Sequence, residues 1–366
     1  MKFDPAPGSQ IRSLDQSRLQ WERIVMGNWV VIAAVTAAAM LRCLCADAAV
    51  EYADPQSLLP GSQAPIPVPR ATQHPLRIAF LPPASTLNFY RPVGAGIRAV
   101  ARSTGSLVTE LAPQEGTDTY AQAGMIQDAI SRGVDAIIIT THDEHAAAPV
   151  LKAAVDKGIV VVIANSDIRS FPTPIHAVVG YSQRRAMRQL GQYLTQLAKT
   201  HPLNVGIIEG LPGYHNTERI EGFLSGIDRA RLSIVARLSG SWTVEGGNTA
   251  SLDMLQAHPN INALVAANDD MAIGASLAAR SLGKQILTTG ADGQAPALDA
   301  IAAGTLGATV DVMPYKIGEI AMQIVLDSLG GKFKGGWVET TATIRDATNI
   351  AAPNGKTEVR STSLRQ

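Results

Sequence analysis

Two polar side chains, Asn268 and Asp292, stand just beyond two short apolar runs in the C-terminal half of the chain. These runs, residues 263–267 and 286–289, are typical of buried strands in a parallel sheet. Open α/β sheets bind ligands at the carboxyl ends of such strands, because loops and helix N-termini converge there. An amide beside a carboxylate suits a polyol or a cation. The alternative is that Asn268 caps a helix and Asp292 lies in a turn.

The other cluster that could do chemistry is His142 to His145, in which two histidines flank Asp143 and Glu144. Because a predicted strand ends just before it, the two acids are typical first-turn residues of a helix. We therefore expect no metal ion and no cofactor. The sequence contains no nucleophile elbow, Walker loop or dinucleotide fingerprint. A barrel aldolase or epimerase is the nearest enzymatic alternative, but the predicted strand ends carry no lysine, so we expect the protein not to be an enzyme.

The charge balance argues against a nucleic-acid partner. Lysine plus arginine number 31, the same as aspartate plus glutamate, so the chain lacks the basic field that duplex DNA demands. The only cysteines, Cys43 and Cys45, lie in an N-terminal segment that we expect to be removed. A mature chain without cysteine has no disulfide, so its core must stabilise it.

An uncharged apolar run at residues 29–41 has the length of a signal-peptide core and is short for a bilayer span. Small residues precede position 49, so we expect a signal peptide over residues 1–48. An uncleaved membrane anchor is the alternative, and both interpretations place the rest of the chain outside the cytoplasm, in the periplasm. Residues 49–75 are rich in proline and are expected to form a disordered tether, and residues 353–366 a disordered tail.

Beyond residue 76, strand-like apolar runs alternate with helical patterns, which predicts parallel sheets covered on both faces by helices. The expected strands are residues 77–81, 107–111, 136–140, 159–164, 205–208, 233–238, 263–267, 286–289 and 308–312. This is too many for one ordinary doubly wound sheet, and leaves either a closed barrel of eight units or two open sheets of about five strands each. A long polar connection at residues 166–174 favours two lobes.

The order of motifs resembles the periplasmic binding proteins of the ribose- and galactose-binding type over roughly residues 76–344. The motifs that carry the resemblance are Leu87 to Tyr90 with Gly96, and residues 133–139, 157–162, 219–223, 267–275, 290–293 and 307–310. The resemblance implies an α/β fold of two doubly wound parallel-sheet lobes joined by a multi-strand hinge, the type I periplasmic binding fold. Lobe 1 is expected to comprise residues 76–178 plus 314–340, and lobe 2 residues 179–313 plus 341–352.

The resemblance also assigns binding residues. It places Phe89 and Tyr90 on the lip of the first lobe and Trp242 opposite them, where aromatic faces cover the apolar face of a sugar ring. The expected polar contacts are Asn165, Asn268 and Asp292, with Thr217 and Asp311 as lesser candidates.

This sequence departs from the family pattern at several of these positions. Asn165 replaces an aspartate and is followed by Ser166 where an arginine is usual. Thr217 stands where an arginine is common, and Val312 where a polar amide is common. A buried ligand hydroxyl that finds no partner costs about 1–3 kcal/mol, so the loss of these donors changes which ligand fits. We therefore do not name ribose as the ligand.

Residues 162–168, 202–205, 221–223 and 258–261 are similar to a periplasmic sensor that reports trimethylamine N-oxide to a membrane histidine kinase. The resemblance to the ribose- and galactose-binding type leads to the first interpretation. It is a monomeric binding protein that captures a small polar ligand, expected to be a carbohydrate, for the membrane permease subunits of an ABC transporter. The alternative is a ligand sensor that signals to a sensor kinase.

Overall fold

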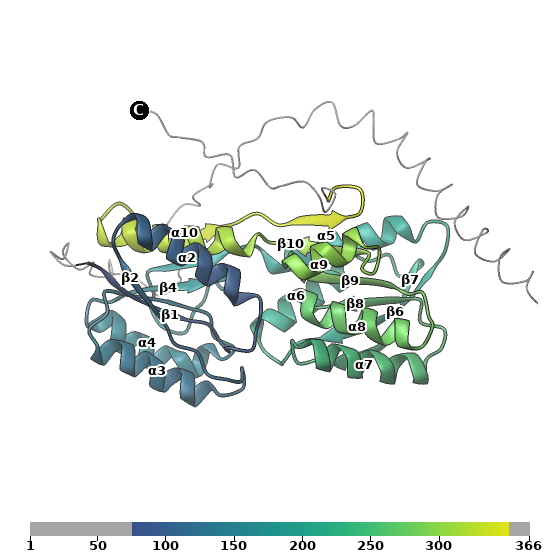
Figure 1. Cartoon of the computed structure of the whole chain (residues 1–366), viewed down its shortest axis with the longest axis horizontal. Helices are drawn as coiled ribbons and strands as arrows, with labels where there is room; N and C mark the ends of the chain where they lie inside the picture. The colour runs from purple at the N-terminus through teal and green to yellow at the C-terminus, as the bar shows by residue number, and fades with distance from the viewer. Residues whose placement is uncertain (1–74, 351–366) are drawn as a thin grey trace, which may run out of the picture. The chain divides into compact units, whose positions relative to one another are not determined.

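The computed structural model describes residues 75–350. The predicted signal peptide and C-terminal tail, and residues 49–74 of the predicted tether, lie outside this range. The described chain forms two α/β lobes, each built on a six-stranded sheet (Figure 1). The prediction of two open parallel-sheet lobes is confirmed, and the closed barrel is excluded.

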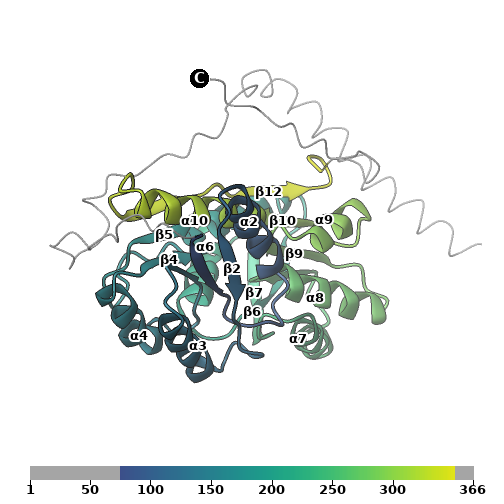
Figure 2. The ribbon, with the colours of Figure 1, turned by 60° about the vertical axis from the view of Figure 1, so that its left-hand side comes forward.

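The first lobe has the strand order β11-β5-β4-β3-β1-β2, and every pair in it is parallel. Its strands are β1 (Arg77–Leu81), β2 (Leu107–Glu110), β3 (Ala136–Ile139), β4 (Val160–Ala164), β5 (Ala177–Gly180) and β11 (Gly336–Glu339). Its helices are α2 (Tyr90–Ser103), α3 (Thr119–Ser131), α4 (Glu144–Asp156) and α10 (Pro314–Leu329). Helices α2 and α10 cover one face of the sheet, and α3 and α4 cover the other (Figures 1 and 2).

The second lobe has the order β12-β10-β9-β8-β6-β7. Its strands are β6 (Leu203–Glu209), β7 (Leu232–Ser239), β8 (Ala263–Ala266), β9 (Leu287–Asp292), β10 (Ala308–Asp311) and β12 (Thr343–Asp346). Its helices are α5 (Gln183–Leu197), α6 (Tyr214–Gly226), α7 (Val244–Ala257), α8 (Asp269–Ser281) and α9 (Ala295–Ala302). Strand β12 runs antiparallel to β10, so this sheet is mixed where the sequence predicted a parallel one.

The chain passes between the lobes three times: after β5, after β10 and after β11. The central strands β3, β4 and β8 are buried along their whole length, which explains their continuous apolar sequences. Strands β5, β11 and β12 were not predicted. Strands β11 and β12 mix polar with apolar residues, and β5 ends at Gly180 after only three apolar residues, so none of them gives the continuous apolar run of a buried strand.

Helices α2 and α10 approach closely through two glycines. A Cβ on Gly96 would lie 2.1 Å from the Tyr315 carbonyl oxygen, and one on Gly318 would lie 2.0 Å from that of Val93. Neither position leaves room for a side chain, because the obstacle is backbone. This contact holds α10 against the first lobe directly after the chain has returned from the second.

We expect Gly318→Ala to lower the free energy of unfolding by about 1–3 kcal/mol, since the added methyl must push α10 away from α2. Urea denaturation and the thermal midpoint measure the loss. The control is Gly124→Ala in α3, where an added Cβ meets no atom within 4 Å. That change should leave stability equal or raise it by about 0.5–1 kcal/mol. Equal effects of the two substitutions would contradict the packing argument.

Candidate functional site: a cleft between the lobes

A cleft opens between the two lobes at the carboxyl ends of their strands. The first lobe contributes Leu87, Phe89, Tyr90, His142 and Asn165. The second contributes His215, Arg219, Trp242, Asn268, Asp270 and Asp292. Six of the eight residues proposed from the sequence therefore lie around one cavity, although they span 204 positions of the chain, from Phe89 to Asp292.

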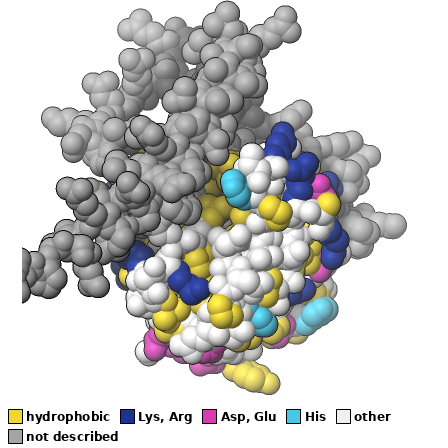
Figure 3. Space-filling model, turned by 90° about the vertical axis from the view of Figure 1, so that its right-hand side faces the viewer, with side chains coloured by type: hydrophobic (Ala, Val, Ile, Leu, Met, Phe, Trp, Pro, Cys, Tyr) yellow, Lys and Arg dark blue, Asp and Glu magenta, His cyan; other side chains and the backbone are white. Residues whose placement is uncertain are grey.

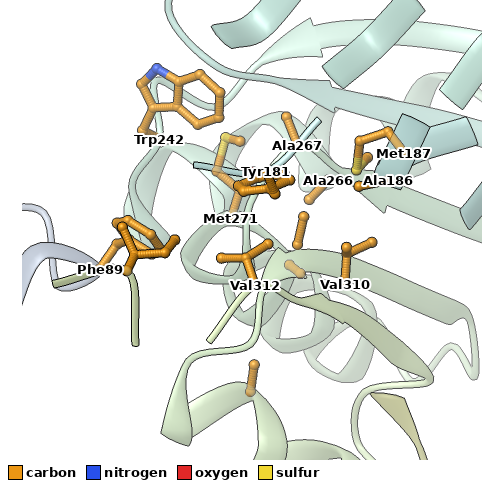
Figure 4. Close-up of a cluster of buried hydrophobic side chains, with 14 of the residues drawn as sticks. Phe89, Tyr181, Ala186, Met187, Trp242, Ala266, Ala267, Met271, Val310 and Val312 are labelled. Atoms are coloured by element: carbon orange, nitrogen blue, oxygen red, sulfur yellow. The ribbon is translucent and has the colours of Figure 1, made fainter. Parts of the chain in front are cut away.

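The aromatic walls come from opposite lobes. Phe89 and Tyr90 meet edge to face, with ring centroids 5.1 Å apart. Figure 4 shows Phe89 and Trp242 on the same side of a buried group that includes Tyr181 and Met271. The Trp242 indole lies directly on the backbone of Gly210, where a Cβ would come within 2.0 Å of it. A side chain at position 210 would therefore displace the Trp242 ring from its place in the cleft.

Asn268 positions that wall and also begins a helix. Its Oδ1 accepts a hydrogen bond from the Met271 backbone at 2.9 Å and caps α8. Its Nδ2 donates to the Trp242 carbonyl oxygen at 3.0 Å. The helix-cap alternative raised from the sequence therefore describes a real function of Asn268. A ligand hydroxyl could reach the second lone pair of Oδ1 without breaking the cap.

The strongest electrostatic feature of the cleft is an ion pair between Arg219 and Asp292. Arg219 Nη1 lies 2.9 Å from Asp292 Oδ1, and each side chain is 4% exposed. The guanidinium also donates to the Ala267 carbonyl oxygen and to Gln183 Oε1. Burial raises the pKa of Asp292 to about 6, although the positive charge of Arg219 opposes the shift.

Arg219 corrects an expectation from the sequence. Thr217 was proposed as a ligand contact and as the replacement for a missing arginine, but Thr217 is exposed and does not line the cleft. Residues two apart on a helix point to nearly opposite sides, so the inward side chain of α6 is Arg219. The guanidinium expected to be absent is therefore present. The signal was available, because Arg219 begins one of the family-like motifs.

Asp311 also lies outside the cleft lining. Its Oδ1 accepts a hydrogen bond from the Met313 backbone at 2.8 Å, and its Oδ2 lies 3.1 Å from Arg345 Nε. It therefore organises the end of β10 where the chain leaves the second lobe. His142, His215, Asp270 and Leu87 were not assigned to the cleft from the sequence. His142 was considered only as a metal ligand, and Leu87 and Asp270 lie in family-like motifs without a predicted role, whereas no motif marks His215.

Asn165 presents an open hydrogen-bond acceptor. Its Nδ2 donates to the Tyr90 hydroxyl at 3.5 Å, while its Oδ1 is buried with no partner in the described part of the chain. Asn165 also holds a left-handed backbone with φ 57°, as do Trp242 at 68° and Asp292 at 133°. Such conformations cost about 1–3 kcal/mol each and concentrate at functional sites.

A model of the periplasmic binding protein domain matches residues 78–333. The chain belongs to this family.

Two bacterial relatives are similar to this binding protein over most of their length. The D-ribose/D-allose-binding protein of Pseudomonas aeruginosa is 37% identical over 237 residues, 61% of this chain and 73% of the relative. The ribose import binding protein of Bacillus subtilis is 32% identical over 252 residues, 68% of this chain and 80% of the relative.

Solved structures agree with the fold. The solute-binding protein of an ABC transporter from Actinobacillus succinogenes, with bound D-allose, gives a TM-score of 0.70 at 25% identity and covers 75% of this chain and 98% of that protein. The solute-binding protein of an ABC transporter from Mycobacterium smegmatis, with bound glycerol, gives a TM-score of 0.70 at 26% identity. It covers 76% of this chain and 96% of that protein. Within residues 75–350 of the binding protein, no helix is long and apolar enough to cross a membrane.

Polar contacts join the two lobes of the binding protein beside the cleft. Asn88 Nδ2 donates to Asp270 Oδ1 at 3.5 Å, and the Tyr214 hydroxyl donates to Asp167 Oδ1 at 3.2 Å. At the crossing segments, Arg185 of α5 forms an ion pair with Glu339 of β11. Closing the lobes therefore pairs polar groups as well as covering the aromatic walls.

The raised pKa of Asp292 has a measurable consequence for stability. A carboxyl that titrates near 3.8 when unfolded and near 6 when folded stabilises the fold fully below pH 3.8, and this contribution is lost as the pH rises through 6. The shift corresponds to about 3 kcal/mol. We expect the free energy of unfolding of the natural chain, relative to Asp292→Asn, to fall by about that amount between pH 4 and pH 7.

Urea denaturation at a series of pH values measures this difference. Asp253→Asn, at an exposed position on α7, is the matched control, and its difference from the natural chain should change much less with pH. A difference for Asp292→Asn that stays constant from pH 4 to pH 7 would contradict the buried, raised carboxyl.

Proposed function

We propose that this protein is the solute-binding component of an ABC importer and that it holds a monosaccharide in the cleft between its lobes. The observation that carries the proposal is the composition of the cleft: aromatic walls from opposite lobes, and between them the Arg219–Asp292 pair with amide groups. A sugar ring has apolar C–H faces and a polar rim, which is the chemistry that this arrangement complements. The relatives named for D-ribose, D-allose and ribose import support it.

The proposal includes the arrangement of the whole chain. Lobe 1 comprises residues 76–178, extended to Gly180 by strand β5, plus 314–340, and lobe 2 comprises the rest of residues 179–313 plus 341–352. A signal peptide at residues 1–48 directs a monomer to the periplasm. The relatives act as binding proteins, which supports a role without catalysis. Because the B. subtilis relative is named for import, we favour membrane permease subunits as the partner over a sensor kinase.

The charges on one face of the second lobe do not favour a nucleic-acid partner. Figure 3 shows the face of the second lobe with basic and acidic side chains interspersed in small groups. Together with equal numbers of acidic and basic residues in the sequence, this gives no sign of the basic surface that nucleic acid would need. Ligand binding would favour the closed arrangement of the lobes by its preference for that state, and the permease would recognise the closed form.

Thermal unfolding of residues 49–366 against a panel of pentoses, hexoses, polyols and trimethylamine N-oxide tests the proposal. A sugar at about one hundred times its Kd should stabilise the folded chain by about 2.7 kcal/mol, enough to raise Tm by several degrees. A shift with the amine oxide alone would support the sensor instead. No shift with any sugar would contradict the proposal.

Calorimetric titration of the best sugar then tests the cleft. Trp242→Ala should weaken binding by about 1–3 kcal/mol through loss of stacking area, and Asp292→Ala should abolish it. Trp337→Phe, which changes a buried tryptophan in the first lobe outside the cleft, is the control and should keep its affinity. Unchanged affinity in both cleft variants would remove the site assignment.

A further inference from the structure

His215 lines the cleft from the second lobe, and its neighbours fix which ring nitrogen carries the proton. Gln183 Oε1 accepts a hydrogen bond from Arg219 Nε at 3.1 Å, and an arginine can only donate. The amide nitrogen of Gln183 donates to Asp167 Oδ1 at 3.2 Å and lies 2.9 Å from His215 Nδ1, which is also 3.2 Å from Gln183 Oε1. The shorter contact of His215 Nδ1 is to an amide nitrogen, which can only donate, so we assign Nδ1 as the acceptor and place the proton on Nε2.

His142 lines the same cleft from the first lobe and has the opposite tautomer. Its Nδ1 lies 3.1 Å from the Gly116 carbonyl oxygen, which can only accept. The proton is therefore on Nδ1, and Nε2 is an acceptor. A Cβ on Gly116 would lie 2.7 Å from the imidazole, so the glycine lets the ring seat against the backbone.

Both imidazole rings are neutral at neutral pH, as these tautomers require. Burial lowers the pKa of His142. Burial, the charge of Arg219 and the nearby His142 together lower the pKa of His215 to about 3. Both imidazoles line the same cavity, one from each lobe.

We propose that His142 and His215 form a hydroxyl-selective subsite, in which one sugar hydroxyl donates to His142 Nε2 and accepts from His215 Nε2–H. This inference rests on the proposed function. A hydroxyl is both donor and acceptor, so a single group satisfies both lobes at once. A carboxylate has no proton to give to His142, and an ammonium group cannot accept from His215. The subsite therefore selects neutral sugars over sugar acids and amino sugars at that ring position.

If the histidines are only structural, their Nδ1 contacts matter and their Nε2 atoms do not. Substitution by Asn or Gln distinguishes this structural role from the ligand-binding role. Asn reproduces the Nδ1 position of histidine, and Gln reaches the Nε2 position. His215→Asn keeps the contact with Gln183 and loses the group in the cleft, whereas His215→Gln does the reverse. His142→Asn and His142→Gln form the same matched pair against the Gly116 carbonyl.

The experiment is calorimetric titration of the natural chain and the four variants with the tightest-binding monosaccharide of the panel and with its single-deoxy analogues. We expect the Asn variants to bind the parent sugar about ten- to a hundredfold more weakly, and the Gln variants to stay within about threefold of the natural chain. One deoxy analogue should bind the natural chain at least about tenfold more weakly than the parent, yet bind the Asn variants about as well as the parent does.

Asn variants with natural affinity, or Gln variants as weak as the Asn variants, would overturn the subsite while leaving sugar binding intact. Deoxy analogues whose losses are the same in all five proteins would also overturn it. A natural chain that binds no monosaccharide would instead overturn the proposed function. Thermal unfolding of each variant verifies that the lobes remain folded.

Discussion

The buried ion pair between Arg219 and Asp292 is the constraint around which the cleft is arranged. Removing two charges from water costs several kcal/mol for each ion, and a pair repays this only when its remaining hydrogen-bonding groups are satisfied. Here the guanidinium also binds Gln183 and the carbonyl oxygen of Ala267, and it lies 5.4 Å from the ring centre of Trp242. One side chain of α6 thereby ties together the ends of β8 and β9, the start of α5 and the aromatic wall.

A second buried acid supports this arrangement from beneath. Asp269 accepts hydrogen bonds from Thr309 Oγ1 at 2.6 Å and from the Gln294 backbone at 2.8 Å, and so joins the start of α8 to strand β10 and to the loop after β9. Burial raises its pKa well above the usual value, and the charge of Asp292 adds to the shift. Two carboxyls in one buried site resist ionising together. An ionised Asp292 in the cleft therefore disfavours ionisation of Asp269 behind it.

How far the sequence predicts this structure depends on how local each signal is. The central strands and Asn268 and Asp292 could be found, because a buried parallel strand is continuously apolar and its carboxyl end is polar. Strands β5, β11 and β12 could not, because β11 and β12 mix polar with apolar residues and β5 has only three apolar residues before Gly180. Thr217 was chosen over Arg219 because a linear match does not say which face of α6 turns inward. The tautomers of His142 and His215 depend on Gly116 and Gln183, which no spacing connects to them.

The contacts between the lobes explain how a ligand can control closure. Asn88 to Asp270 at 3.5 Å and Tyr214 to Asp167 at 3.2 Å are long hydrogen bonds, and even a good one contributes only about 0.5–1.5 kcal/mol net. Moving a two-state equilibrium from 1:99 to 99:1 needs about 5.5 kcal/mol of differential affinity. A ligand held between the lobes as we propose would supply this in the closed form alone, through the aromatic walls and through polar groups on each side. Because the direct contacts between the lobes are weak, the ligand determines the equilibrium between the open and closed forms.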